Sequence, residues 1–228
     1  MAEKISLEQI KKNPKIEVLV NHANDMLEHI GYTEHGRRHV GYVSKVAGDM
    51  LETLGYDDRT VELARIAGWI HDIGNSINRH NHGMNGAILL YPILTEIGMD
   101  IKEIAEILSA IGNHEAETGS PVGPISAALI IADKSDAHRT RVRRGKYDPF
   151  DIHDRVNYSI KENKVTVDVD KKEINYEMAM DNTSSVMEYM QIFLSRMIMC
   201  EKAAEFLGCK LNIMINGTTI NNGIKKQL

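Results

Sequence analysis

Histidines and aspartates that recur in the first 140 residues are the side chains of this sequence best suited to chemistry. Of the ten histidines in the 228 residues, six fall between positions 35 and 114. Neutral imidazole is the commonest protein ligand for transition metals, so this clustering indicates a metal site. The sharpest feature is the adjacent pair His71 and Asp72 at the end of an apolar stretch. Neighbouring residues of a helix point about 100° apart, so the two side chains can hold one ion between them, and the two oxygens of Asp72 can bridge two ions.

The apolar periodicity indicates the elements that must position such residues. His39 begins the apolar stripe of one helix, His114 directly follows another, and Asp133 lies on the buried side of a third. A buried carboxylate is costly unless it is paired or bound to a metal. Helical bundles build metal sites from side chains that several helices deliver to the core. The expected helices cover residues 16–30, 39–54, 58–70, 84–97, 101–112 and 124–138.

The pattern changes after Asp148 and Pro149, where polar and β-branched residues begin to alternate. This alternation is typical of strands. The expected elements are a three-stranded antiparallel meander over 155–178, a long helix over 183–207 and a strand over 210–215. The sequence therefore predicts a mainly α protein, with a helical metal-binding domain over 1–148 and a small α+β appendage over 149–228 that could act as a lid or a dimerisation element.

The composition excludes several classes of protein. Lys and Arg number 27 against 32 Asp and Glu, and the formal net charge of −5 argues against stable binding of duplex nucleic acid. The longest apolar run, Val122–Ala132, is far shorter than the ~20 residues of a membrane helix. The first fifteen residues carry charges without an apolar core, which does not fit a secretory signal. With two cysteines only, the expectation is a cytoplasmic protein with reduced thiols.

The order of the histidines and aspartates resembles the HD superfamily of metal-dependent phosphohydrolases. The similar stretches are EHGRRHVGYVS, HDIGN, HGMNGAILL, NHEAE and ADKSD, which together cover residues 33–145, about half of the chain. The pair His71 and Asp72 alone is a weak motif. The ordered set of histidines and aspartates, placed in segments with a matching helical pattern of apolar residues, is specific. The resemblance implies a helical bundle that binds divalent ions and hydrolyses phosphate esters.

The resemblance also implies roles for individual residues. His39, His71, Asp72 and Asp133 match the core set that binds one divalent ion. His82 and His114 match the extra histidines of members that hold two ions, with Asp72 as the bridge. His80 competes for the role of His82, which we favour because HGMNGAILL is similar to the start of the family's helix; His80 would then face the substrate as an acid or base. Mixed imidazole and carboxylate ligation suits Fe, Mn, Zn, Co or Ni.

A basic run, RTRVRRGK, follows the helix that carries Asp133. It is either a solvated surface or a clamp for phosphate, which the planar guanidinium group of arginine suits well. The candidate phosphate ligands in the run are Arg139, Arg141, Arg143 and Arg144. Arg38 beside His39 is a further candidate phosphate ligand, and Lys134 beside Asp133 is a candidate cation with a catalytic role, as Asp72 and His80 are also expected to have.

The leading hypothesis is hydrolysis of a nucleotide or another small phosphoester by metal-activated water. One alternative is a di-iron oxygenase, since a branch of the same superfamily uses this six-ligand set. Another is a nucleotide sensor with a structural metal site. Cleavage of cyclic dinucleotides is disfavoured, because the branch with that activity has HDIGK and a GYP motif, whereas this chain has HDIGN and no GYP. The expected partners are a small phosphorylated substrate and a second copy of the chain, with no membrane.

Overall fold

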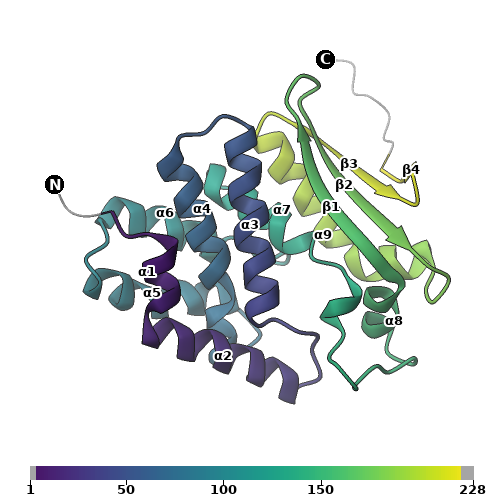
Figure 1. Ribbon diagram of the computed structural model, residues 1–228, viewed down its shortest axis with the longest axis horizontal. Helices are drawn as coiled ribbons and strands as arrows, with labels where there is room; N and C mark the ends of the chain where they lie inside the picture. The colour runs from purple at the N-terminus through teal and green to yellow at the C-terminus, as the bar shows by residue number, and fades with distance from the viewer. Residues whose placement is uncertain (1–3, 222–228) are drawn as a thin grey trace.

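The computed structural model describes residues 4–221 and has two parts that lie side by side (Figure 1). The first part is a helical bundle, and the second is a small sheet with helices against it. In chain order, the bundle consists of α1 (Leu7–Lys12), α2 (Pro14–His29), α3 (Arg37–Thr53), α4 (Asp58–Ile70), the 3-10 helix η1 (His71–Ser76), α5 (His82–Glu96), α6 (Ile101–Gly112) and α7 (Pro124–Lys134). The predicted mainly helical fold is confirmed.

Capping side chains and glycines define where several of the bundle helices begin and end. Asp57 caps α4 by accepting hydrogen bonds from the backbone amides of Arg59 and Thr60, and Asp100 caps α6 in the same way through Lys102. Gly55 and Gly98 adopt positive φ angles just after α3 and α5, a conformation that favours glycine at helix ends. These short connections keep consecutive helices packed as neighbours.

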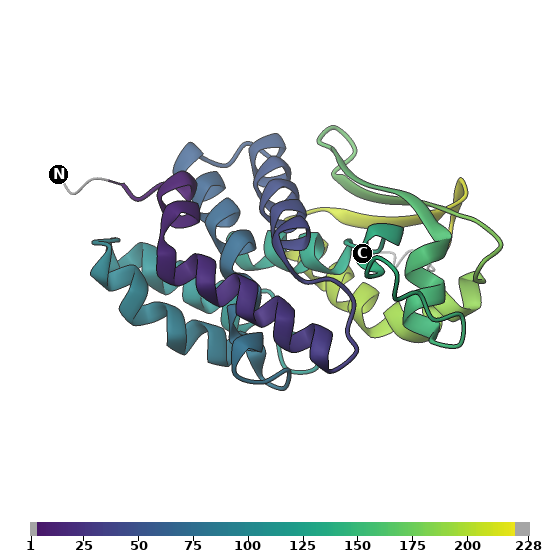
Figure 2. The same cartoon turned by 60° about the horizontal axis from the view of Figure 1, so that its bottom comes forward.

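The second part consists of η2 (Arg139–Arg141), α8 (Ile152–Ser159), β1 (Ile160–Asp168), β2 (Glu173–Met180), α9 (Val186–Phe206), β3 (Lys210–Ile215) and β4 (Thr218–Thr219). The sheet order is β1-β2-β3-β4. The β1 strand pairs antiparallel with β2, β3 pairs parallel with β2, and β4 pairs antiparallel with β3. The helix α9 crosses between β2 and β3 and packs against α7 of the bundle, as the turned view also shows (Figure 2).

The expected three-stranded meander is wrong in its first strand, which is the helix α8. Asp151 caps this helix by accepting a hydrogen bond from the amide of His153. Val156 and Ile160, four residues apart, are fully buried, while Tyr158 between them is 41% exposed. The alternation of Val156, Tyr158 and Ile160 is therefore also compatible with a helix, in which residues four positions apart lie on the same face. The expected helix over 183–207 and the strand over Lys210–Ile215 are confirmed, although that strand pairs in parallel.

One hydrophobic core extends through both parts. Its buried residues form a single cluster that includes α3, α4, α6 and α7 of the bundle as well as α9, β2 and β3. The side chains of α7 are buried at almost every position, and this helix lies between the other bundle helices and α9. Among the described residues, no helix is both long and apolar enough to span a membrane.

Candidate metal centre

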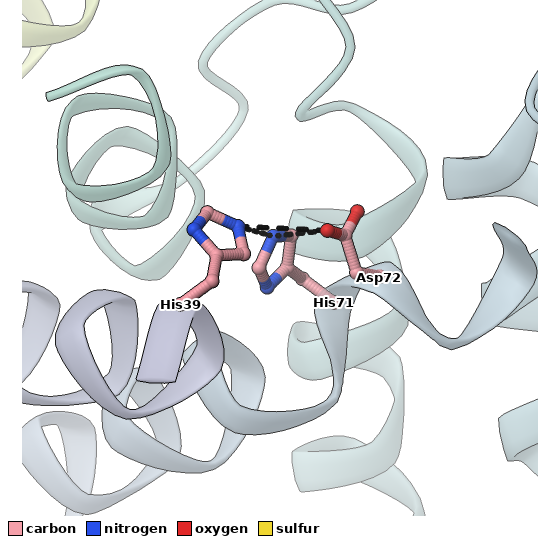
Figure 3. A group of neighbouring side chains, drawn as sticks. All are labelled: His39, His71 and Asp72. Atoms are coloured by element: carbon pink, nitrogen blue, oxygen red, sulfur yellow. Dashed lines mark hydrogen bonds and ion pairs between the residues drawn. The ribbon is translucent and has the colours of Figure 1, made fainter. Parts of the chain in front are cut away.

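Four side chains from three elements converge on one point of the bundle core. The Nε2 atoms of His39, on α3, and His71, at the start of η1, lie 3.3 Å apart. Asp72 Oδ2 lies 3.5 Å from each of these nitrogens. Asp133 Oδ1, from α7, lies 3.4 Å from the nitrogen of His39 and 3.6 Å from that of His71. Figure 3 shows His39, His71 and Asp72 with these atoms turned toward one another.

A second group of side chains adjoins the first. His82, the first residue of α5, and His114, just after α6, bring their Nε2 atoms within 3.0 Å. Asp72 Oδ1 lies 3.4 Å from the nitrogen of His82 and 4.0 Å from that of His114. The two oxygens of Asp72 therefore face two different pairs of histidines, which is the arrangement of a carboxylate that bridges two ions.

The other ring nitrogen of each histidine contacts an oxygen. The Nδ1 atoms of His71, His82 and His114 lie 3.0, 3.0 and 2.6 Å from the carbonyl oxygens of Gly68, Arg79 and Ile111, respectively. The Nδ1 of His39 lies 2.6 Å from Asp136 Oδ2. A carbonyl accepts hydrogen bonds only, so Nδ1 is the donor and the Nε2 lone pair is left for a metal.

The donor set fits a divalent transition metal. Asp72 Oδ2 is buried and has no hydrogen-bond partner within residues 4–221, which is costly unless a cation satisfies it. In the absence of metal a proton takes that place: burial lowers the pKa of His39, but its contacts with the carboxylates of Asp133, Asp136 and Asp72 raise it to about 10. Imidazole and carboxylate donors together suit Fe, Mn, Co, Ni and Zn.

A cavity of about 700 Å³ gives access to these groups. Asp72, His82 and Asp133 of the two groups line it, together with residues of both parts of the chain. Its cationic side chains are Arg79, Lys134, Arg141 and Arg196. The volume lies within the range of about 300–1,000 Å³ that is typical of small-molecule sites.

The predicted catalytic residues Lys134 and His80 also lie in the cavity wall. Lys134 is buried and donates a hydrogen bond of 2.6 Å to Asp133 Oδ2, which leaves Oδ1 directed at the histidines. His80 is exposed, and the structure brings His82 rather than His80 to the group around Asp72. His82 is further fixed by Glu115, whose Oε1 lies 3.3 Å from its Nδ1.

The arginines predicted to clamp phosphate are dispersed. Arg141 lines the cavity, and its two terminal nitrogens contact Asp136 at 3.1 Å and His35 Nε2 at 2.9 Å. Arg38 forms a bidentate pair with Asp136 and lies outside the cavity lining. The other three also lie outside it: Arg139 bonds to Asp181, Arg143 bonds to Glu28 and Asn24, and Arg144 is exposed.

Several residues at the site were not anticipated from the sequence. Asp136 holds the His39 ring, and Asn75 donates a hydrogen bond of 2.9 Å to Asp72 Oδ1. A signal existed for both, because Asp136 ends the stretch ADKSD and Asn75 ends HDIGN. Arg79 and Arg196 carried no such signal, since each stands alone among residues of other types.

Comparison with known proteins agrees with this geometry. Residues 36–140 match the HD domain family. The uncharacterized protein MJ1020 of Methanocaldococcus jannaschii is 24% identical over 213 residues, 83% of this chain and 81% of that protein. Ribonuclease Y of Deinococcus radiodurans is 32% identical over 118 residues, 50% of this chain and 18% of its own length. Ribonuclease Y of Lawsonia intracellularis is 31% identical over 105 residues, 46% of this chain and 18% of its own length.

This chain therefore spans less than a fifth of these two ribonucleases. All six histidine and aspartate ligand candidates lie inside the segment that matches the HD domain family. The similarity of residues 36–140 to the HD domain family thus includes the whole candidate metal centre.

Proposed function

We propose that this protein is a metal-dependent phosphohydrolase that acts on a small phosphate ester, such as a nucleotide. The observation that carries the proposal is the position of Asp72, which faces two pairs of histidines and also lines a cavity with four cationic side chains. The match of residues 36–140 to the HD domain family supports it, because HD domains form a superfamily of metal-dependent phosphohydrolases. Fold membership alone does not select the substrate.

In this proposal, each residue of the site has a separate role in hydrolysis. His39, His71, Asp72 and Asp133 would hold a divalent ion, which when bound would lower the pKa of an attacking water and polarise a phosphoryl oxygen. Asp133 is oriented by Lys134, which also places a positive charge beside the reacting phosphoryl group. Arg79, which lies 3.4 Å from His82 Nε2, provides a second cation at the same place. His80, which is exposed in the cavity wall, would give a proton to the leaving oxygen.

The similarity to Ribonuclease Y makes a phosphodiester the second class of substrate to test. The matched segment is less than a fifth of those proteins, so the similarity does not choose between a nucleotide and an RNA end. The cavity favours the smaller substrate, since it is lined by residues from both parts of the chain rather than by one open face.

The proposal is tested by loading the metal-free protein with Mn, Fe, Co, Ni or Zn in turn. Each form is assayed for phosphate release from nucleoside mono-, di- and triphosphates and for cleavage of short oligoribonucleotides. We expect metal-dependent hydrolysis of at least one phosphate ester, abolished in Asp72→Asn and unchanged in Lys202→Gln, an exposed position on α9. Inert protein with every metal would contradict the proposal, and oxygen consumption by the iron form would favour the oxygenase instead.

A further inference from the structure

One wall of the cavity comes from outside the HD segment. It is built by α8 and α9, the two helices that flank the sheet. The residues that these elements and their caps contribute to the lining are Asp151, His153, Asn157, Phe193 and Arg196. Nothing in the chemistry described above uses these side chains, yet two of them carry polar groups that lack partners.

Arg196 is the first of these unpartnered groups. Within residues 4–221, no carboxylate lies at ion-pair distance from its guanidinium group, which stacks on the Phe193 ring at 4.9 Å. Burial lowers the pKa of Arg196; the charges of Asp133 and Glu117 raise it, and those of Arg79 and Arg141 lower it. A partly buried cation without an ion-pair partner is unfavourable in the free protein. An anion bound in the cavity would remove that cost.

Arg79, on another wall of the cavity, also forms no ion pair with a carboxylate of the described residues. Its contacts are the Asn75 side-chain oxygen at 3.3 Å, His82 Nε2 at 3.4 Å and the Tyr32 ring at 5.3 Å, and none of these is a carboxylate. By contrast, Lys134 and Arg141 form ion pairs with Asp133 and Asp136. Among the described residues, the cavity therefore contains two arginines that form no ion pair with a carboxylate.

Asn157 is the second unpartnered group of the α8 and α9 wall. Its side chain belongs to a residue that is 5% exposed, and its amide nitrogen donates a hydrogen bond of 2.8 Å to the carbonyl of His153. This bond fixes the orientation of the amide, so the other atom is the oxygen. Asn157 Oδ1 is buried and has no partner among the described residues. A buried acceptor of this kind calls for a donor.

We propose that α8 and α9 form the recognition face of the site, where Arg196 binds an anionic phosphate group and Asn157 Oδ1 accepts a hydrogen bond from a hydroxyl or amino group of the same ligand. The ligand class is thus a phosphate ester whose organic portion carries such donors. The assignment deepens the proposed function and rests on it, since it names the substrate features that the phosphohydrolase would read. It also gives the C-terminal α+β part a role in specificity.

Two probes separate the two contacts. Inorganic phosphate tests the anion contact, and the methylene phosphonate analogue of adenosine 5′-monophosphate, which cannot be hydrolysed, tests both. Binding to manganese-loaded protein is measured by calorimetry for wild type, Arg196→Gln, Arg196→Lys, Asn157→Leu, Asn157→Ser and Lys202→Gln. The last variant removes an exposed cation from the same helix and serves as the matched control. Thermal unfolding of each variant establishes that it is folded.

We expect Arg196→Gln to weaken both probes by about tenfold or more, and Arg196→Lys to restore part of the loss. Both Asn157 variants are expected to weaken the phosphonate and to leave inorganic phosphate unaffected, while Lys202→Gln binds both like wild type. Equal binding of phosphate by wild type and Arg196→Gln, or no binding of either probe by wild type, would overturn the inference. Binding needs no turnover, so probe binding without hydrolysis of any ester would contradict the proposed function and not this inference.

Discussion

At the scale of single residues, Asp72 decides what the site can do. Among the described residues, it is the carboxylate that lies within 4.0 Å of histidines of both pairs, and its Oδ2 is buried without a hydrogen-bond partner. The neighbouring histidines present Nε2 because oxygens contact every Nδ1. Ligand atoms are thus oriented before a metal arrives, which reduces the reorganisation that binding requires.

Metal binding should compete with a proton on His39. Its pKa is raised from 6.5 to about 10, because the contacts with Asp133, Asp136 and Asp72 outweigh burial. In metal-free protein the protonated ring stabilises the fold fully below pH 6.5, and this stabilisation is lost as the pH rises toward about 10. A metal must displace the proton, so we expect metal affinity to rise about tenfold per pH unit between about pH 7 and pH 9.

Calorimetry in buffers of different ionisation enthalpy measures the protons released. We expect release of about one proton per site near pH 8 in wild type, and a smaller release in Asp136→Asn, which loses one of the carboxylates that raise the pKa of His39. An affinity that does not change over this pH range would show that His39 is neutral before the metal binds.

At the scale of elements, close helix contacts bring the ligands together. A Cβ on Gly68 of α4 would lie 2.7 Å from the backbone nitrogen and Cα of Ser44 on α3, so the two helices touch here through their backbones. A Cβ on Gly74 of η1 would overlap the carbonyl oxygen of His82 on α5. The first contact sets the distance between His39 and His71, and the second sets the distance between Asp72 and His82.

Gly68→Ala should therefore force α3 and α4 apart. We expect a loss of about 1–3 kcal/mol in the free energy of unfolding together with weaker metal binding, measured by urea denaturation and by competition with a chelator. Gly41→Ala is the matched control, because a Cβ there would meet only Trp69 at 3.7 Å, an ordinary contact. Equal stability and metal affinity in both variants would show that the close approach is not needed.

The elements also show what the sequence could and could not predict. Apolar patterning predicted α2 to α7 and α9, most of which bury one face, but not the short helix α1. It failed over 155–159, where Val156 and Ile160 fit a strand and a helix equally well and the Asp151 cap favours the helix. The parallel pairing of β3 with β2 depends on the crossover of α9, which is a tertiary contact that local patterns do not contain.

The same distinction applies to the site. The histidines and aspartates were identified because each lies at a helix end or on a buried stripe, so their order carried the signal. The arginine run was less informative, because a short irregular segment turns successive side chains in different directions: Arg141 faces the cavity, and Arg143 bonds to Glu28 on α2. Arg196 enters from a helix far along the chain, and its position follows only from the packing of α9 on α7.

At the scale of the whole molecule, the centre ties together elements that are distant in sequence. Its candidate ligands come from α3, η1, α5, the end of α6 and α7, within one continuous hydrophobic core. A ligand that binds the folded chain and not the unfolded chain raises the free energy of unfolding by mass action. A centre whose ligands come from five elements should do so strongly, since the unfolded chain does not keep them together.

We expect the metal-loaded protein to be more stable than the metal-free protein by about 3 kcal/mol at a free metal concentration of about one hundred times the Kd. The midpoint of thermal unfolding should rise further as the metal concentration increases, and excess chelator should reverse the change. Differential scanning calorimetry provides the measurement. A midpoint that is insensitive to metal and chelator would contradict a centre that links these elements.

The central claim is a two-ion centre bridged by Asp72, and metal content per chain tests it most directly. Elemental analysis after purification without chelator or histidine tag compares wild type with Asp72→Ala, His82→Ala and His80→Ala. The account predicts about two ions per chain in wild type and in His80→Ala, about one in His82→Ala and about none in Asp72→Ala. A wild-type protein with no ion, or loss of an ion in His80→Ala but not in His82→Ala, would contradict it.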